Sequence, residues 1–171
     1  MENNKKDDKI VIKIASTEDF FDLNLCAREF IEFIDDFKKK FLDKRFFVLT
    51  AYFNGVLAGI LVGEDKKKID SLKKLVPTVY LHFLYVNPKY RNKHLGKALL
   101  NEFIKLQKKR DVASINIKLP EKFKKGIIFF QKNDFIITRK HKHKVVLECN
   151  LWNDFGIRNC HVIEKDFDNT F

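Results

Sequence analysis

Two adjacent stretches of the sequence contain residues whose types and spacing could do chemistry. The first, 78–86 (TVYLHFLYV), is an apolar run that carries Tyr80 and His82. The second, 87–97 (NPKYRNKHLGK), leaves that run through Asn-Pro, passes through a basic loop and enters a helix. The imidazole of histidine exchanges a proton near neutral pH, and the first main-chain amides of a helix bind anions. One short segment therefore encodes both a candidate proton acceptor and a candidate anion site.

The loop at 87–97 is suited to binding an anion through its main chain. The first amides of a helix lack internal acceptors, and the helix dipole favours negative charge beside them. Gly96 is the one glycine left in this loop, and His94 stands two residues before it. A left-handed backbone at residue 94 would cost about 1–2 kcal/mol, whereas a right-handed helical one costs nothing and still presents its amide. The pattern favours a weakened or adjusted site over an inactive one.

The apolar run at 78–86 is predicted to be a buried strand. Alternation along it places four side chains on one face: Tyr80, His82, Leu84 and Val86. Tyr85 is expected on the opposite face. His82 is the first candidate for a catalytic base, acting directly or through a water, and Tyr80 is the second. The alternative for His82 is a packed core histidine bonded to main chain.

Two other histidine-containing groups are poorer candidates. His141-Lys142-His143 has the spacing of a metal-binding pair on a strand, but nothing nearby completes a ligand set, and an exposed basic turn is favoured. Cys160-His161 is isolated, and a thiol nucleophile would need an orienting base. We predict no metal site.

The elements that must position these residues alternate between strands and helices. Residues 10–15 alternate as a strand does, and apolar residues at helical spacing across 16–42 predict two amphipathic helices or one broken helix. Asn54-Gly55 predicts a tight hairpin between 45–53 and 56–63. A polar insertion is expected at 64–75.

The remainder of the chain continues this pattern. We predict a helix at 95–110, a strand at 112–119, a helix at 121–133 and a final hairpin of 134–140 with 144–152. The unit from 78 to 119 favours a right-handed parallel crossover. The predicted fold class is therefore α/β, with a mixed sheet.

The chain length and composition predict one domain. Its 171 residues, 45% of them hydrophobic, suit a single core. We expect a disordered tail at 1–9, one domain at 10–152 and a C-terminal extension at 153–171. Neither a membrane-spanning run nor a signal segment is apparent, and three scattered cysteines suggest no disulfide framework. A cytoplasmic protein is expected.

The net charge of +11 has two interpretations. It could serve a polyanionic partner such as RNA. It could also reflect the lysine-, asparagine- and phenylalanine-rich composition that an AT-rich genome produces. The second is favoured, because arginine, the better phosphate reader, is scarce.

The order of elements and the loop together resemble the GNAT superfamily of N-acetyltransferases. Val86-Asn87-Pro88 matches the family's Val-x-Pro, and 91–96 (RNKHLG) matches Arg/Gln-x-x-Gly-x-Gly/Ala, with His94 replacing the first glycine. Residues 126–135 (GIIFFQKNDF) resemble Ala-x-x-Phe-Tyr-x-x-x-Gly-Phe. The resemblance covers roughly 10–150 and implies the GNAT fold, a twisted mixed sheet of six to seven strands flanked by about four helices.

The resemblance also implies where acetyl-CoA, the cosubstrate, would bind. The amides of 92–97 would hold the pyrophosphate, Arg91 and Lys93 would add charge, and the strand edge would bind the pantetheine arm. The implied cofactor-binding residues are Leu84, Tyr85, Val86, Arg91, Asn92, Lys93, His94, Leu95, Gly96 and Lys97. Arylalkylamine-type members carry histidines at the positions of Tyr80 and His82. The family's usual tyrosine acid corresponds to Phe130, which cannot donate a proton.

The leading functional prediction is an N-acetyltransferase that moves an acetyl group directly from acetyl-CoA to an unidentified amine. The first alternative is a non-catalytic GNAT-fold module that binds acyl-CoA or a partner, suggested by His94 and Phe130. The second is an RNA-directed acetyltransferase acting on aminoacyl-tRNA, or an RNA binder. A monomer or a homodimer through the C-terminal strands is expected.

Overall fold

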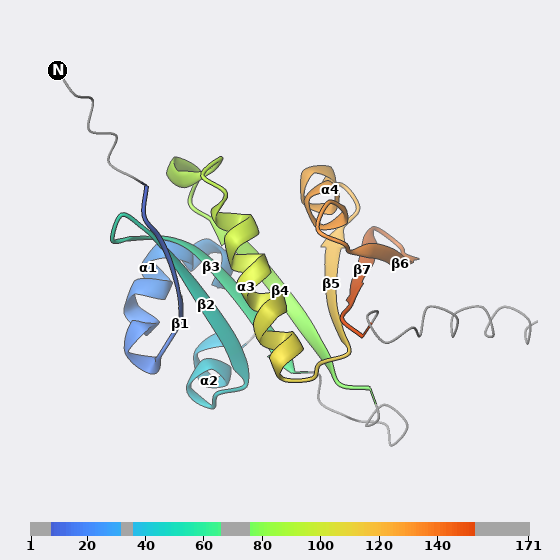
Figure 1. The fold of residues 1–171 in the computed structure, drawn as a ribbon, viewed down its shortest axis with the longest axis horizontal. Coiled ribbons are helices and arrows are strands. Elements are labelled where there is room, and N and C mark those ends of the chain that lie inside the picture. The colour runs from blue at the N-terminus through green and yellow to red at the C-terminus, as the bar shows by residue number, and fades with distance from the viewer. Residues whose placement is uncertain (1–7, 32–35, 66–75, 153–171) are drawn as a thin grey trace, which may run out of the picture.

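The computed structural model describes residues 8–31, 36–65 and 76–152. Together these form a seven-stranded sheet with helices on both faces (Figure 1). The strands are β1 (Ile10–Ile14), β2 (Phe46–Phe53), β3 (Val56–Asp65), β4 (Thr78–Val86), β5 (Ser114–Pro120), β6 (Ile136–His141) and β7 (Lys144–Asn150). The helices are α1 (Phe20–Ile31), α2 (Phe37–Leu42), α3 (Leu95–Lys109) and α4 (Lys124–Gln131), with 3₁₀ turns η1 (Thr17–Asp19) and η3 (Pro88–Tyr90).

The sheet order is β1-β2-β3-β4-β5-β7-β6. Every pairing is antiparallel except that of β4 with β5, which is parallel and connected through α3. The predicted parallel unit and final hairpin are therefore confirmed. Because β7 inserts between β5 and β6, the hairpin joins the sheet through its second strand.

Two glycines shape the first hairpin, one in its turn and one on its second strand. Asn54 (φ 49°) and Gly55 (φ 85°) form the turn between β2 and β3, as predicted from the Asn-Gly pair. Gly63 allows α3 to approach β3, since a Cβ there would lie 2.6 Å from the Phe103 ring. Both positions help to fix β3, and hence β4, relative to α3.

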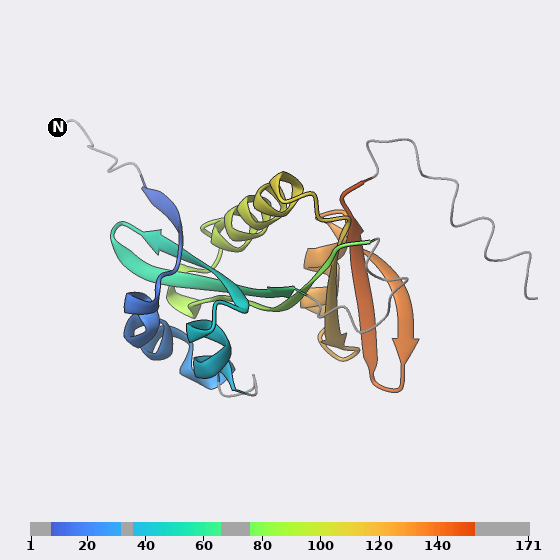
Figure 2. The same ribbon diagram turned by 90° about the horizontal axis from the view of Figure 1, so that it is seen from below.

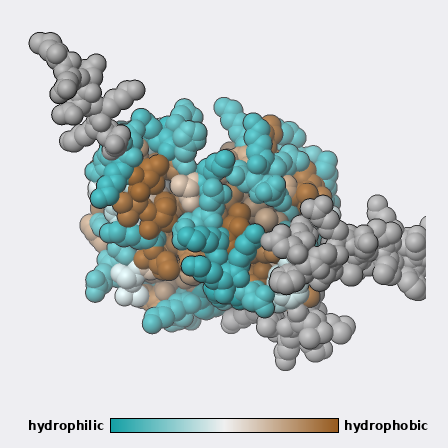
Figure 3. All heavy atoms as spheres, viewed as in Figure 1, coloured by the Kyte–Doolittle hydropathy of each residue, from teal (hydrophilic) through white to brown (hydrophobic). Residues whose placement is uncertain are grey.

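The two faces of the sheet are covered by different helices (Figure 2). α3 packs on β2, β3 and β4 on one face, whereas α1 packs on β3 and β4 and α2 on β2 on the other. α3 turns an apolar stripe toward the sheet: Leu95, Leu99, Leu100 and Phe103. The side chains of α1 and α2 form a separate apolar cluster with Phe46, Ile60 and Val62. Viewed from α3, a hydrophilic band over that helix separates apolar areas on its two sides (Figure 3).

Several predicted boundaries are wrong by two or three residues. The helix expected at 121–133 begins only at Lys124, because Pro120 ends β5 and a turn follows it. The strand expected to end at 63 extends to Asp65, so Glu64 belongs to β3 and not to an insertion. The strand expected from 112 begins at Ser114. The expectations for 1–7, 66–75 and 153–171 lie outside the described residues.

No helix in the described part of the chain is both long and apolar enough to cross a membrane.

Candidate active site

The site begins where the two parallel strands at the centre of the sheet separate. β4 pairs with β5 only from Thr78↔Ser114 to Leu81↔Ile117. β4 then continues to Val86 and β5 to Pro120 without pairing to each other. The last part of β4 therefore has one edge paired with β3 and one edge open. An open edge inside a sheet can accept an extended ligand as another strand would be accepted.

The open edge offers main-chain groups at alternate residues. The Asn87 amide donates to the Ala58 carbonyl at 2.8 Å, across the edge that faces β3. Main-chain groups alternate between the two edges of a strand, so those of Tyr85 also face β3. Those of Leu84 and Val86 face the open edge, where Arg91 Nε donates to the Val86 carbonyl at 3.2 Å.

The basic loop lies directly beyond this edge and leads into α3. Among the described residues, no acceptor is found for the amides of 92–97, and the first helical bond runs from Ala98 N to the His94 carbonyl at 2.9 Å. Asn92 (φ 64°) and His94 (φ 59°) are both left-handed. Left-handed residues in such a loop turn successive amides into an anion-binding concavity. Of the two conformations considered for residue 94, the structure has the costlier one.

The charged side chains of the loop are not equivalent. Lys93 Nζ lies 3.3 Å from Asp8 and 5.5 Å from the centroid of the Phe53 ring, so it is turned toward the N-terminal segment. Lys97 is exposed on the first turn of α3, with no ion-pair partner in the described residues. Lys97 is therefore the cation best placed to meet an anion at the helix start.

Gly96 lies in the first turn of α3, close to β4 and α4. A Cβ at this position would lie 3.4 Å from Leu84 Cδ2 and 3.7 Å from both Val86 Cγ2 and Phe129 Cζ. These neighbours come from the open edge of β4 and from α4. Gly96 thus marks where α3, β4 and α4 converge around the amides.

A bulge in β4 overturns the predicted alternation of its side chains. Val62 pairs with Phe83 and Gly63 with Leu81, which leaves His82 as an extra residue in β4. Leu84 and Val86 consequently pack on the α3 side of the sheet. Tyr85 packs on the α1–α2 side, the side of the Phe46 ring that His82 contacts at 5.2 Å. The prediction that His82 shares a face with Leu84 and Val86, and not with Tyr85, was therefore wrong.

His82 is held by a carboxylate from the neighbouring strand. Its Nε2 lies 2.8 Å from Glu64 Oε2, and the other carboxylate oxygen accepts from Arg45 at 3.0 Å. The side chains of His82 and Glu64 are only 19% and 16% exposed, so water screens their contact weakly. The alternative of a core histidine bonded to main chain does not describe this contact, because the partner is a side-chain carboxylate.

Tyr80 lies beside His82, and their ring centroids are 5.0 Å apart in an edge-to-face arrangement. Burial raises the pKa of the Tyr80 hydroxyl, although a hydrogen bond from the Lys118 main chain acts in the opposite direction. Lys118 is the first residue of β5 beyond the last pair with β4. The Tyr80 side chain therefore spans the point at which the strands separate, and its phenol holds its proton at neutral pH.

Comparison with known proteins places this geometry in a family. Residues 14–135 match the model of the Acetyltransferase (GNAT) family. The chain belongs to the GNAT family of acetyltransferases. No curated protein sequence matches it closely enough to count as a relative.

Solved structures share the fold at low identity. Arabidopsis thaliana NAA60 in complex with acetyl-CoA is 16% identical, with a TM-score of 0.70 over 83% of this chain and 98% of that one. A PaiA N-acetyltransferase from Thermoplasma acidophilum in complex with coenzyme A is 20% identical, with a TM-score of 0.65 over 83% and 99%. The ribosomal-protein-S18-alanine N-acetyltransferase from Escherichia coli is 16% identical, with a TM-score of 0.66 over 84% and 94%.

The predicted GNAT family, α/β fold and acetyl-CoA-dependent acetyltransferase class are thus confirmed. In this GNAT domain, two positions depart from the family pattern in a related way. His94 and Asp134 both replace family glycines, and both keep a positive φ, 59° and 66°. Both residues therefore adopt a conformation that glycine reaches at no steric cost.

Phe130, at the position of the usual tyrosine acid, is a core residue of this GNAT domain. Its ring is 4% exposed and packs edge-to-face on Phe129 and Phe135, at 5.2 and 5.1 Å between ring centroids. It has no group to donate a proton, so any acid must come from elsewhere.

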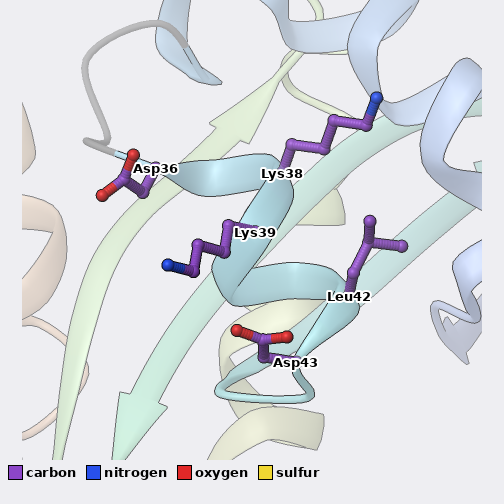
Figure 4. A pocket seen from close by; sticks show the side chains of 5 residues that line it. All are labelled: Asp36, Lys38, Lys39, Leu42 and Asp43. Atoms are coloured by element: carbon purple, nitrogen blue, oxygen red, sulfur yellow. The ribbon is translucent and has the colours of Figure 1, made fainter.

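Elsewhere on the surface of the described residues, no comparable arrangement is found. A hollow on α2 is lined by Asp36, Lys38, Lys39, Leu42 and Asp43, whose side chains spread outward and do not converge (Figure 4). His141 and His143 are exposed at the β6–β7 turn. Within the described residues, no three metal-ligating side chains gather.

Glu64 and Arg45 are the site residues that sequence reasoning missed. Glu64 follows the apolar run 56–63 directly, at the point where the sequence predicts a polar insertion. Its inward position results from the β3–β4 register, in which Glu64 lies opposite Tyr80. The one signal is the predicted hairpin itself: if 45–53 pairs over its full length across the Asn54-Gly55 turn, its partner 56–63 must extend by one residue, to Glu64.

Proposed function

We propose that this chain acetylates an amine and that it holds acetyl-CoA where β4 and β5 separate. The observation that carries the proposal is the position of His82. It is the first residue of β4 without a β5 partner, on the same strand that ends at the basic loop. His82 lies about 13 Å along the strand from Val86, a length that an extended pantetheine arm spans. A pyrophosphate at the loop would thus place its thioester near His82.

The cosubstrate would be held mainly by main-chain groups. The amides of Asn92, Lys93, His94, Leu95, Gly96 and Lys97 would bind the pyrophosphate. Arg91 and Lys97 would add positive charge, and Lys93 would do so after leaving Asp8. The Leu84 carbonyl and the open-edge groups of Val86 would bind the pantetheine amides, whereas Tyr85 would contribute through its side chain.

The chemistry would be direct transfer. The amine nitrogen attacks the thioester carbonyl, so a C–N bond forms and the C–S bond breaks. His82 takes the proton that the amine loses, and the Tyr80 phenol donates one to the departing thiolate. The Leu84 amide, directed at the open edge, donates to the carbonyl oxygen as negative charge develops on it. Proximity supplies much of the rate, because both reactants are held on one strand edge.

The acceptor is proposed as an uncharged or singly charged amine. The net charge of +11 repels polycations such as polyamines. A peptide N-terminus is the first acceptor class to test, since one similar structure is named for acetylating the alanine of ribosomal protein S18. Lysine side chains, arylalkylamines and aminoacyl-tRNA complete the panel. A ten-fold kinetic preference for a polyamine would contradict the charge argument.

The test has two stages. Calorimetry measures acetyl-CoA binding, and thiol release is then followed on the amine panel. Burial raises the pKa of Cys149 to about 11 and raises that of Cys26 as well, so these two thiols react slowly with the detection reagent. A blank without acceptor corrects for the remaining background. Absence of binding at millimolar acetyl-CoA would overturn the proposal.

One alternative has a specific observation in its favour. The buried Phe130 removes the usual acid, as expected of a GNAT module that binds acyl-CoA without turnover. Binding without release of free thiol on the whole panel would support that alternative. RNA binding, a cytoplasmic location and a monomeric or homodimeric state stay predictions. Affinity for RNA that does not fall with salt would remove the RNA interpretation.

A further inference from the structure

Glu64 contacts a ring nitrogen of His82, the candidate base, through its side chain. Its carboxylate lies 2.8 Å from His82 Nε2, within hydrogen-bonding distance. A carboxylate can only accept, so Nε2 must carry the proton of this hydrogen bond. In the neutral imidazole the lone pair then belongs to Nδ1.

The carboxylate is itself fixed from the other side. Arg45 donates to Glu64 Oε1 at 3.0 Å, and Arg45 immediately precedes Phe46, the residue of β2 opposite Glu64. The two carboxylate oxygens therefore have different partners, one cation and one imidazole. This arrangement limits rotation of the carboxylate and holds the His82 ring in one orientation.

The next residue of β3 provides an internal comparison. Asp65 pairs with Arg110 at 2.7 Å, but its side chain is 61% exposed, against 16% for Glu64. Exposed ion pairs contribute little, about 0–1 kcal/mol. The Asp65–Arg110 pair thus resembles the Glu64–Arg45 pair in joining a carboxylate to an arginine. It differs in being more exposed and in having no described histidine contact.

We propose that Glu64 is a positioning residue for His82, which rests on the function proposed above. It fixes the proton on Nε2, so that Nδ1 accepts the amine proton, and it stabilises the imidazolium that results. Among the described residues, the charged and titratable groups around His82 are Glu64, with Arg45 behind it, and the neutral Tyr80 phenol. Lys40 lies farther away, 5.5 Å from the centroid of the Phe46 ring that His82 contacts. Of these, Glu64 alone contacts the imidazole nitrogen in the described structure.

Substitution of Glu64 tests this role in the full-length protein. Glu64→Gln keeps the size but allows the amide to donate to Nε2, which favours the wrong tautomer. We expect kcat at pH 7 to fall at least ten-fold, with the Kd for acetyl-CoA changed less than two-fold. Glu64→Asp should recover part of kcat, and Asp65→Asn is the matched control.

A merely structural role would give a different pattern. Glu64→Gln would then lower the melting temperature and acetyl-CoA affinity together, or change kcat no more than Asp65→Asn. Either result would overturn the positioning role. If Glu64→Gln does not fold, the comparison of Glu64→Asp with wild type decides the question, with kcat set against the Kd for acetyl-CoA as readout.

A second measurement is independent of turnover. Nitrogen-15 NMR of histidine-labelled wild-type protein distinguishes protonated from unprotonated ring nitrogens. We expect His82 to be protonated at Nε2 and unprotonated at Nδ1 at pH 8, and this preference should be lost in Glu64→Gln. A wild-type His82 protonated at Nδ1 would overturn the inference even if the protein acetylates amines. If no amine is acetylated but the Nε2 tautomer is found, the proposed function fails and the tautomer-fixing contact stands.

Discussion

The two ends of the open edge of β4 use different kinds of chemistry. At the loop end, residues 92–97 present main-chain amides. At the other end, His82, Glu64 and Arg45 meet through side chains from β4, from β3 and from the segment before β2. A main-chain site tolerates changes of residue type as long as the backbone keeps its course. A side-chain site tolerates few, because each atom depends on a register set elsewhere.

The largest effect is expected at the side-chain end. His82→Ala removes the proposed base, and general base catalysis is worth about 10²–10⁴-fold. We expect kcat to fall at least 100-fold at pH 7, with acetyl-CoA affinity retained because the loop is untouched. Steady-state kinetics and calorimetry measure both quantities. His141→Ala, at an exposed histidine of β6, is the matched control.

An unchanged pH–rate profile in His82→Ala would rule out His82 as the base. The side-chain end would then lose its proposed base, and Tyr80, the second candidate for a base, would be the next residue to test.

A smaller effect is expected for Tyr80. Its pKa is raised by burial above the ordinary value of 10, so the phenol stays protonated at neutral pH and ionises only above pH 10. Tyr80→Phe should lower kcat about ten-fold, which is less than the usual 10²–10⁴-fold of acid–base catalysis, because a CoA thiolate already leaves readily. In wild type, a rate that needs the phenol proton should hold to pH 10 and fall beyond it. Rate measurements from pH 7 to 10.5 test both expectations.

Retention of full activity by Tyr80→Phe would make solvent the proton donor. Tyr52→Phe, at a half-buried tyrosine of β2 outside the proposed site, is the matched control.

The loop end should respond weakly to loss of a single charge. Lys97→Ala removes one exposed cation at the start of α3, and such a charge contributes about 0.3–1 kcal/mol. We expect the Kd for acetyl-CoA to rise about two- to five-fold, with a smaller dependence on salt than in wild type. Lys109→Ala, at the far end of the same helix, is the control. A loss greater than 100-fold would mean that side chains, and not amides, dominate this end as well.

The loop end was also the more predictable from sequence. Val86-Asn87-Pro88 and the segment 91–96 lie together in the chain, so a local pattern marked the strand end, the loop and the helix start. The side-chain end was predicted only in part. His82 was identified, but its bulge, its carboxylate partner and the face of Tyr85 depend on pairing between β3 and β4. A period of two cannot reveal a bulge, because the extra residue shifts every later side chain to the opposite face.

The smallest effect is expected at His94, a residue with a Cβ whose main chain is left-handed. The left-handed φ of 59° costs about 1–2 kcal/mol for a residue with a Cβ. Glycine removes that cost but adds about 0.4–1 kcal/mol of unfolded-state entropy. His94→Gly should therefore stabilise the protein by about 0.5–1 kcal/mol, which is a rise of about 1–4 °C in Tm. Acetyl-CoA affinity should change less than two-fold, since the amides remain.

Two further glycine substitutions make this measurement decisive. Asp134→Gly, at a φ of 66°, should behave as His94→Gly does. Ala98→Gly, in the right-handed first turn of α3, should instead destabilise by about 0.5–1 kcal/mol. If His94→Gly lowers Tm as Ala98→Gly does, the left-handed backbone carries no net cost there. If it raises Tm yet weakens acetyl-CoA binding more than five-fold, the imidazole of His94 contributes to the site, and the loop is not the purely main-chain anion site that its geometry indicates.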